Sequence, residues 1–452
     1  MHGQAASDDA LRIPRRAHVL AILMLVMVFN YIDRILVAVL AEPIKTQFGI
    51  SDFQLGLLGG PAFAFLYSTL SIPIARLADR TSRVNIIAAT VALWSVFTAL
   101  CGVTTQYWQL LLARVGTGIG EAGCTPAAMS LVADYFPIRQ RSTALATFII
   151  GAPIGTLVAA LTGGWIAQVA DWHLVFLALG MPGIVLAIIF KMIVKEPLRS
   201  GDDGTEVSML GALKALLSKR AFAHTLLGSI VGGTTMLAFV QFLNAYLSRV
   251  RGLPPLLAST YFGLLAGIGI GVGTFLGGYI PDRLSARYPS ALALVGAVGM
   301  LACAPLYWLG LYADNQLLML VLMLLASICL GVFIPVICSL AQTMAPSSMR
   351  ATAVAMTLFS CQFFGGVFGP PLLGLLSDSL SSRLYVGPGS YHIHCSAHSA
   401  LISACASARG HGLDAALAIW IVGFVWSAAH FFLAARTLQH DRVEPLVGSL
   451  AQ

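Results

Sequence analysis

The sequence has very little charge. Asp, Glu, Lys and Arg make up 10% of its 452 residues, whereas a typical soluble domain has about 25%. Hydrophobic residues make up 58%, and the mean hydropathy is +0.85. This composition excludes an ordinary soluble domain and indicates a protein with many membrane spans.

Signals of export and of catalysis are also missing. The basic start ALRIPRRAH leads into an apolar segment too long for the core of a signal peptide, and no small-residue cleavage site follows it. No apolar segment contains H-E-x-x-H, G-x-S-x-G or a paired histidine and acid. We therefore expect an uncleaved first helix, no enzymatic activity and no cofactor.

Long apolar segments dominate what is present. A span needs about 20 apolar residues, and lipid offers no hydrogen bonds, so each span should be a helix. The sequence predicts an all-α membrane protein with twelve transmembrane helices, at 17–41, 53–77, 84–103, 107–134, 143–169, 172–193, 222–247, 258–280, 290–311, 316–343, 351–376 and 412–437.

The basic residues indicate the orientation. With both termini inside, 19 of the 26 Lys and Arg fall in inside segments, five fall in outside loops, and Arg34 and Arg114 lie within spans. Cytoplasmic loops carry such an excess, so we expect a multi-pass protein of the cell (inner) membrane with cytoplasmic termini. Dispersed basic charge gives no support to a nucleic-acid partner.

Two of the eight cysteines share the outside loop before the last span. Cys395 and Cys405 lie there among four histidines, His392, His394, His398 and His411. If that side is oxidising, the pair can form a disulfide. A metal site is the less favoured alternative, because the histidines would have to converge on one point.

The chain repeats itself at an offset of 209 residues. PAAMSLVADYFPIRQRSTALA (126–146) matches PVICSLAQTMAPSSMRATAVA (335–355), and ARLADR (75–80) echoes GYIPDR (278–283). Such self-similarity is typical of a duplicated helical bundle. The prediction is an N-terminal six-helix bundle (1–194), a cytoplasmic linker (195–221) with an amphipathic helix, and a C-terminal six-helix bundle with a short tail (222–452).

Several motifs resemble the major facilitator superfamily. ARLADRTSR (75–83) is similar to the loop signature after its second helix, and RVGTGIGEA (114–122) is similar to the signature of its fourth. NYIDR (30–34) together with GIGEA (118–122) resembles the Spinster family, specifically its bacterial homologues. The resemblance implies alternating access, proton coupling, and, in animal relatives, transport of lysophospholipids or sphingosine-1-phosphate.

Charges inside the first and fourth spans form the candidate site. A charge there is costly and usually functional. Helical spacing puts Arg114 and Glu121 on one face, and Asp33 and Arg34 about 100° apart on another helix, so the latter two should have different partners. We expect Asp33 and Glu121 to carry the coupling proton, with Arg34, Arg114 and Asn30 as charge partners or substrate contacts. Static ion pairs between the two helices are the structural alternative.

The second half offers neutral groups. Gln241 and Asn244 share one helical face, and Gln362 lies in the eleventh span. A cavity charged on one wall and weakly polar on the other suits an amphiphile. The superfamily resemblance also implies a conformational lock, in which Asp79 docks on the helix that begins near Arg350. The residues of this lock are Asp79, Arg80, Arg83, Asp134, Arg141 and Arg350.

The function predicted is that of a secondary, proton-coupled transporter of a lysolipid-like or sphingolipid-like substrate, acting as a monomer in contact with membrane lipid. A multidrug or organic-ion exporter of the same superfamily is the main alternative. A receptor or a lipid-acting enzyme is more remote, because neither explains the duplicated halves with buried charges.

Overall fold

The computed structural model describes residues 2–197, 209–285, 288, 290–346, 349–387, 390, 391, 395 and 403–441. Its described residues form helices without a β-strand. Spatially, the chain forms two compact units: unit 1 comprises 1–202, 240–267 and 374–413, and unit 2 comprises 203–239, 268–373 and 414–452.

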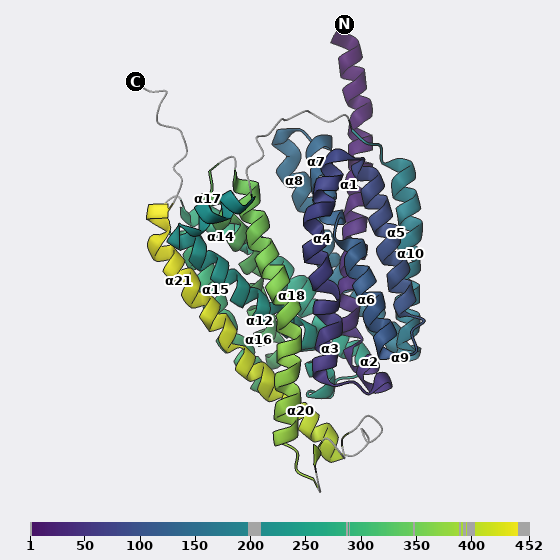
Figure 1. Ribbon diagram of the computed structural model, residues 1–452, viewed down its shortest axis with the longest axis vertical. Helices are drawn as coiled ribbons and strands as arrows, with labels where there is room; N and C mark the ends of the chain where they lie inside the picture. The colour runs from purple at the N-terminus through teal and green to yellow at the C-terminus, as the bar shows by residue number, and fades with distance from the viewer. Residues whose placement is uncertain are drawn as a thin grey trace. The chain divides into compact units, whose positions relative to one another are not determined.

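Unit 1 contains most of the first half. Within it, α5 packs against α6 and α10, α1 packs against α9, and α4 packs against α6, and Figure 1 shows these helices along the bundle. The helices that lie entirely in this unit are α1 (His2–Val39), α2 (Ala41–Phe48), α3 (Asp52–Gly59), α4 (Pro61–Arg80), α5 (Arg83–Cys101), α6 (Tyr107–Glu121), α7 (Cys124–Tyr135), α8 (Ile138–Ile149), α9 (Gly151–Val169), α10 (Trp172–Ile193) and α13 (Pro255–Phe262).

Unit 2 contains most of the second half. Its α15 packs against α16 and α21, and α14 packs against α16. The helices that lie entirely in it are α11 (Met209–Leu217), α14 (Ile270–Ser285), α15 (Ala291–Tyr312), α16 (Gln316–Gly331), α17 (Phe333–Met344) and α21 (Val422–Asp441). Three helices and one π-helix contribute residues to both units: α12 (Arg220–Arg249), α18 (Arg350–Arg383), α20 (Ser403–Trp420) and η1 (Gly263–Gly269).

Eleven helical stretches among the described residues are long and apolar enough to cross a membrane. The predicted span at 107–134 is instead divided at Ala122 and Gly123 into α6 and α7, of 15 and 12 residues. Neither part alone reaches the length of a span. The chain is a multi-pass membrane protein, whereas the total of twelve spans and the position of the termini stay predictions.

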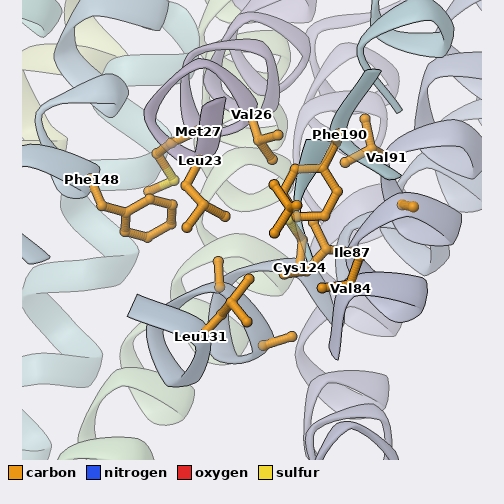
Figure 2. Close-up of a cluster of buried hydrophobic side chains, with 14 of the residues drawn as sticks. Leu23, Val26, Met27, Val84, Ile87, Val91, Cys124, Leu131, Phe148 and Phe190 are labelled. Carbon is orange, nitrogen blue, oxygen red and sulfur yellow. The ribbon is translucent and has the colours of Figure 1, made fainter. Parts of the chain in front are cut away.

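Apolar side chains fix the packing of the first bundle. Figure 2 shows a core in which Leu23, Val26 and Met27 of α1 lie close to side chains from α5, α7, α8 and α10. Phe148 and Phe190 are almost completely buried in it. Because interiors are packed as densely as crystals, this core holds α1 in a defined position relative to its neighbours.

Caps end the helices where the sequence supplies them. Ser51 accepts from the backbone N–H of Gln54, and the Gln54 side chain accepts from the N–H of Ser51, a complete capping box at the start of α3. Gly49 ends α2 with φ +62°, a left-handed conformation that favours glycine. These caps fix the short connection from α2 to α3.

Candidate functional site

Glycines bring α6 close to two neighbours. A Cβ atom on Gly118 would lie 2.5 Å from the carbonyl oxygen of Phe63 on α4, and one on Gly120 would lie 2.6 Å from the backbone nitrogen of Trp94 on α5. Small residues permit such close approach of membrane helices. Glu121 follows Gly120 at the end of α6, and its side chain is completely buried.

The first ion pair joins α1 to α6. Arg34 donates from Nε to Oε2 of Glu121 at 2.7 Å. Asn30, one turn earlier on α1, donates from Nδ2 to the same oxygen at 2.7 Å. The Glu121 side chain is 0% exposed and that of Arg34 is 14% exposed, so the arginine side chain is the less buried partner.

A second, longer ion pair joins the same helices. Nη1 of Arg114 lies 3.5 Å from Oδ1 of Asp33 and 3.4 Å from the Asp33 carbonyl oxygen. Thr98 of α5 donates from Oγ1 to Oδ1 of Asp33 at 2.6 Å. Asp33 and Arg34 therefore have different partners, as their 100° separation around α1 predicts.

Aromatic rings surround the guanidinium of Arg34. Its Cζ lies 4.3 Å from the ring centre of Tyr67, 5.1 Å from that of Phe63 and 5.4 Å from that of Tyr31. Phe63 and Tyr67 stack on each other, and Phe63 also lies 5.4 Å from Arg114. Rings at such distances stabilise a partly desolvated cation. They hold Arg34 in place beside its ion pair with Glu121.

Several polar atoms in this site have no hydrogen-bond partner among the described residues. They are Oε1 of Glu121, Oδ2 of Asp33, Nη2 of Arg34, Nε of Arg114 and Oδ1 of Asn30. A buried polar atom without a partner is costly and calls for an explanation. Each acid thus has one oxygen in an ion pair and one oxygen that could take a proton.

The neutral candidates lie in both units. In unit 1, Gln241 fills the space that a Cβ atom would occupy at Gly59, and its Nε2 is buried without a described partner. Asn244 donates from Nδ2 to the carbonyl oxygen of Val39 at 2.7 Å. Gln362 lies on α18 in unit 2 and is half-buried.

An ion-pair network surrounds Arg83, at the start of α5. Arg83 contacts Oδ2 of Asp134 at 2.5 Å, Oε1 of Glu196 at 2.8 Å and Oγ of Ser130 at 3.0 Å. Glu196 also accepts from Ser82 and from the backbone N–H of Val84. Burial raises the pKa of Glu196, but the Val84 N–H, Arg83 and Ser82 outweigh it, so that its pKa is lowered.

The other residues of the expected conformational lock have few described contacts. Arg141 donates from Nε to the carbonyl oxygen of Phe136 at 3.1 Å. Arg80 and Arg350 are exposed. The side chain of Asp79 lies outside the described side chains.

A second network, the Asp52 network, consists of Glu42, Lys45, Asp52, Arg249 and Asp378. Arg249 of α12 donates to both oxygens of Asp52, at 2.7 and 2.9 Å, and to Oε1 of Glu42 at 2.6 and 3.1 Å. Lys45 and Ser377 also donate to Asp52. Asp378 of α18 accepts from the backbone N–H groups of Asp52 and Phe53. Five charges from both sequence halves thus meet within unit 1.

Burial affects the lysine of this network. It lowers the pKa of Lys45, and the nearby Arg249 acts in the same direction, whereas Asp52 and Glu42 oppose them. The Lys45 side chain is 9% exposed and that of Asp52 is 1% exposed. Removing one partner of so buried a pair would leave an uncompensated charge.

Cys395 and Cys405 are joined by a disulfide. The sequence allowed this bond on the condition that the loop faces an oxidising compartment. Among the described residues, no three His, Cys, Asp or Glu side chains could hold a metal ion together. His392, His394 and His398 lie outside the described residues.

Sequence reasoning did not find Thr98, Glu196 or the Asp52 network. Thr98 belongs to an apolar helix in which hydroxyls usually bond to their own backbone, as Thr234 and Thr235 do here. Lys45 and Arg249 are two of the five basic residues that the sequence places in outside loops, where they counted only toward the orientation. The sequence did contain a signal for the Asp52 network, because charges of both signs lie at the predicted outer ends of the spans.

Comparisons with known proteins agree with this architecture. Residues 23–389 match the model of the Major Facilitator Superfamily. A bacterial homologue of the human lysosomal transporter Spinster, crystallised in an inward-facing, unoccupied conformation, is 31% identical with a TM-score of 0.85, over 96% of this chain and 99% of that one.

Two curated relatives are similar over most of their lengths. An MFS-type efflux pump of Mycolicibacterium smegmatis is 35% identical over 377 residues, covering 82% of this chain and 87% of that protein. Protein spinster homolog 1 of Homo sapiens is 28% identical over 402 residues, covering 81% of this chain and 74% of that protein.

Proposed function

This chain belongs to the major facilitator superfamily and, within it, to the Spinster family of membrane transporters, and from that premise we propose that it is a proton-coupled carrier of an amphiphilic substrate in the cell membrane. The observation that carries the proposal is the pair of separate ion pairs between α1 and α6, Arg34 with Glu121 and Asp33 with Arg114. Each contains an acid with one oxygen outside the pair.

Protonation of Glu121 would change what Arg34 does. A neutral acid attracts the guanidinium far less than a carboxylate does, so Arg34 becomes free to bind an anionic group. Arg is suited to this, because its planar fork matches carboxylate and phosphate oxygens. Asp33, paired more loosely with Arg114 at 3.5 Å, is the second proton acceptor. Differential protonation of the two transport states is what couples a proton to transport.

An amphiphile fits the surroundings of these charges. Among the charged groups, the partly exposed Arg34 is the cation that a substrate head group would contact. The rings of Tyr31, Phe63 and Tyr67 lie around it. Within unit 1, Gln241 has a buried amide nitrogen without a described partner, which is a neutral polar group available to a substrate. The resemblance of NYIDR and GIGEA to the Spinster family, whose animal members carry lysophospholipids or sphingosine-1-phosphate, implies a lipid-like substrate.

Export of drugs or organic ions is the second candidate. The similarity to an efflux pump, at 35% identity, favours it, and the three rings around Arg34 would also accept an aromatic cation if the arginine moved away. Competition separates the two candidates: a lysolipid should block uptake of a labelled lysolipid more strongly than an aromatic cation does, and the reverse order would favour the exporter.

The two networks supply locks for alternating access. The Asp52 network would hold one side of the transporter closed. Its residue Asp378 lies on α18, the helix that precedes the loop containing Cys395, and we expect that loop on the outer side of the membrane. On the inner side, Arg83 with Asp134 and Glu196 would fix the ends of α5 and α7, while docking of Asp79 near Arg350 remains a prediction from the sequence. Asp79→Asn should increase labelling of the site from the cytoplasmic side.

Flux into proteoliposomes tests the proposal. Purified protein in liposomes should accumulate a labelled lysolipid when a pH gradient is imposed, and the accumulation should collapse when a protonophore removes the gradient. Liposomes without protein provide the blank. Uptake that is protein-dependent but unaffected by the protonophore would exclude proton coupling, and binding without uptake would favour a receptor.

A further inference from the structure

The contact of α5 with Asp33 on α1 has more acceptors than protons. Oγ1 of Thr98 lies 2.6 Å from Oδ1 of Asp33 and 2.9 Å from the carbonyl oxygen of Trp94, one turn earlier on α5. A threonine hydroxyl has one proton to donate and two lone pairs that accept. Thr98 therefore donates to only one of these two oxygens at a time, and which one depends on where the protons are.

Burial gives this hydroxyl weight. Thr98 and Asp33 are each only 2% exposed, so bulk water does not replace a lost hydrogen bond between them. Oδ2 of Asp33 is buried without a partner among the described residues, and Nη1 of Arg114 lies 3.5 Å from Oδ1. At 2.6 Å, the hydroxyl makes a much shorter contact with the acid than the guanidinium does.

The length of this contact fits an ionised acid. A hydroxyl that donates to a carboxylate lies about 2.5–2.7 Å from it, and Oγ1 of Thr98 lies within this range of Oδ1. In this state the Trp94 carbonyl needs no second donor, because a carbonyl inside a helix already accepts from the N–H four residues later. Ionised Asp33 thus has Thr98 as its donor.

A protonated acid reverses the roles. The O–H of Asp33 donates to Oγ1 of Thr98, and Thr98 turns its own proton to the carbonyl oxygen of Trp94. The added proton comes from water, and Thr98 keeps its proton and changes only the direction of donation. A half-turn about χ2 exchanges the two carboxyl oxygens, so a proton taken up on Oδ2 reaches the same position. The hydroxyl therefore has a partner in both protonation states.

Few ionisable groups face Asp33. Arg114 and Glu121 on α6 and Cys101 on α5 interact with it electrostatically, and Arg34 follows it on α1. Of the other helices packed against α1, α9 has no ionisable side chain, α10 has them only near its ends, and α8 has them in its first turn. The charges of α3 and α7 are in the Asp52 network and the network around Arg83.

We propose that Thr98 is a positioning residue for the coupling proton, donating to Asp33 while the acid is ionised and accepting from it while the acid carries the proton. This role rests on the proposed function, in which Asp33 is a proton acceptor. A hydrogen bond to an ionised group is about twice as strong as a neutral one, so Thr98 stabilises ionised Asp33 more. Without the hydroxyl, Asp33 should take up its proton at a roughly ten-fold lower proton concentration, about one pH unit higher.

Infrared titration of the purified full chain measures this effect. The C=O band of a protonated carboxyl group reports the protonated fraction at each pH, and Asp33→Asn, which lacks the band, identifies the contribution of Asp33. Thr98→Val keeps the shape of the side chain without the hydroxyl, and Thr98→Ser keeps the hydroxyl. We expect the midpoint of Thr98→Val about one pH unit above that of the wild type, and the midpoint of Thr98→Ser close to the wild type.

A buried threonine on α9 provides the matched control. Thr156 donates to the carbonyl oxygen of Ala152 at 3.1 Å and is 4% exposed, so Thr156→Val should leave the midpoint unchanged. If Thr98→Val does not fold, Thr98→Ala replaces it with the same expectation. The proposal is overturned if Asp33 shows no titrating band, if the midpoint of the Thr98 variant equals that of the wild type, or if Thr156→Val shifts it as far.

The titration does not depend on transport, which separates this proposal from the proposed function. A shifted midpoint in a protein without gradient-driven uptake would refute the proton-coupled carrier and support the role of Thr98. Gradient-driven uptake together with an unchanged midpoint in Thr98→Val would support the carrier and refute the role of Thr98.

Discussion

Arg34 on α1 and Glu121 on α6 form the central contact of the site, with Nε and Oε2 2.7 Å apart. The next residue along α1 toward the N-terminus, Asp33, contacts Arg114 on the same helix α6. Two neighbours in the sequence thus use two partners seven residues apart. This arrangement lets one ion pair open while the other still connects α1 to α6.

Substitution of Arg34 should affect substrate binding. Arg34→Lys keeps the charge but loses the planar fork, so binding of a lysolipid with an anionic head group should weaken roughly ten-fold, about 1.4 kcal/mol. Arg34→Ala should weaken it further. Titration of the purified protein with a labelled lysolipid measures both. Equal affinity for the wild type and Arg34→Ala would exclude Arg34 as the head-group contact.

Loss of Arg249 should open the proposed outer side. Arg249→Met leaves Asp52 buried with less compensation, at a cost of about 3–5 kcal/mol for a buried pair. A cysteine replacing the buried Val39 should then react faster with a membrane-impermeant maleimide added from outside. Protein without the Val39 substitution gives the background.

A matched control for Arg249 is available on α18. Arg383→Met removes an exposed arginine from the last turn of that helix and should leave the labelling rate unchanged. Labelling that rises equally in both variants, or in neither, would contradict a gating role of the Asp52 network.

Glu196 should contribute stability that depends on pH. Its pKa is lowered in the folded protein, so its contribution is complete above the unfolded value of about 4.3 and is lost as pH falls through the folded value. Glu196→Gln should therefore lower the melting temperature at neutral pH, by an equivalent of about 0.5–1 kcal/mol for a partly exposed group. The difference should disappear in acid.

Thermal unfolding across this pH range measures the effect. Asp314→Asn, which changes an exposed acid in the connection from α15 to α16, should show no such pH-dependent difference. A loss of stability in Glu196→Gln that is the same at every pH would mean that packing, and not charge, is responsible.

Gly118 should not tolerate a methyl group. In Gly118→Ala the new Cβ would lie 2.5 Å from the backbone oxygen of Phe63, which must shift, at a cost of about 1–3 kcal/mol. Gly278→Ala adds a methyl group to α14 where, apart from the adjoining backbone of its own helix, no atom lies within 4 Å, so it should be neutral or slightly stabilising. Melting temperatures compare the two, and an unchanged value for Gly118→Ala would disprove the close approach of α6 and α4.

The fold was largely predictable because lipid offers no hydrogen bonds to the backbone, so that an apolar span must form a helix. Apolar length gives the spans, and helical spacing separated Asp33 from Arg34 and placed Arg114 and Glu121 on one face of their helix. The break between α6 and α7 was not predicted, since Ala122 and Gly123 do not differ from other small residues within spans. The Asp52 network was missed for another reason: Asp52, Arg249 and Asp378 are hundreds of residues apart, and helical periodicity carries no information about such pairs.

The most direct test of the account is uphill uptake by Glu121→Gln in proteoliposomes. Gln mimics the protonated acid at nearly constant volume, and a size-exclusion profile and melting temperature establish that the variant is folded. We expect accumulation of a lysolipid driven by a pH gradient to collapse, while exchange of lysolipid down its own gradient continues. Uphill, gradient-dependent accumulation by folded Glu121→Gln, and equally by Asp33→Asn, would contradict proton coupling and leave the two ion pairs as static contacts.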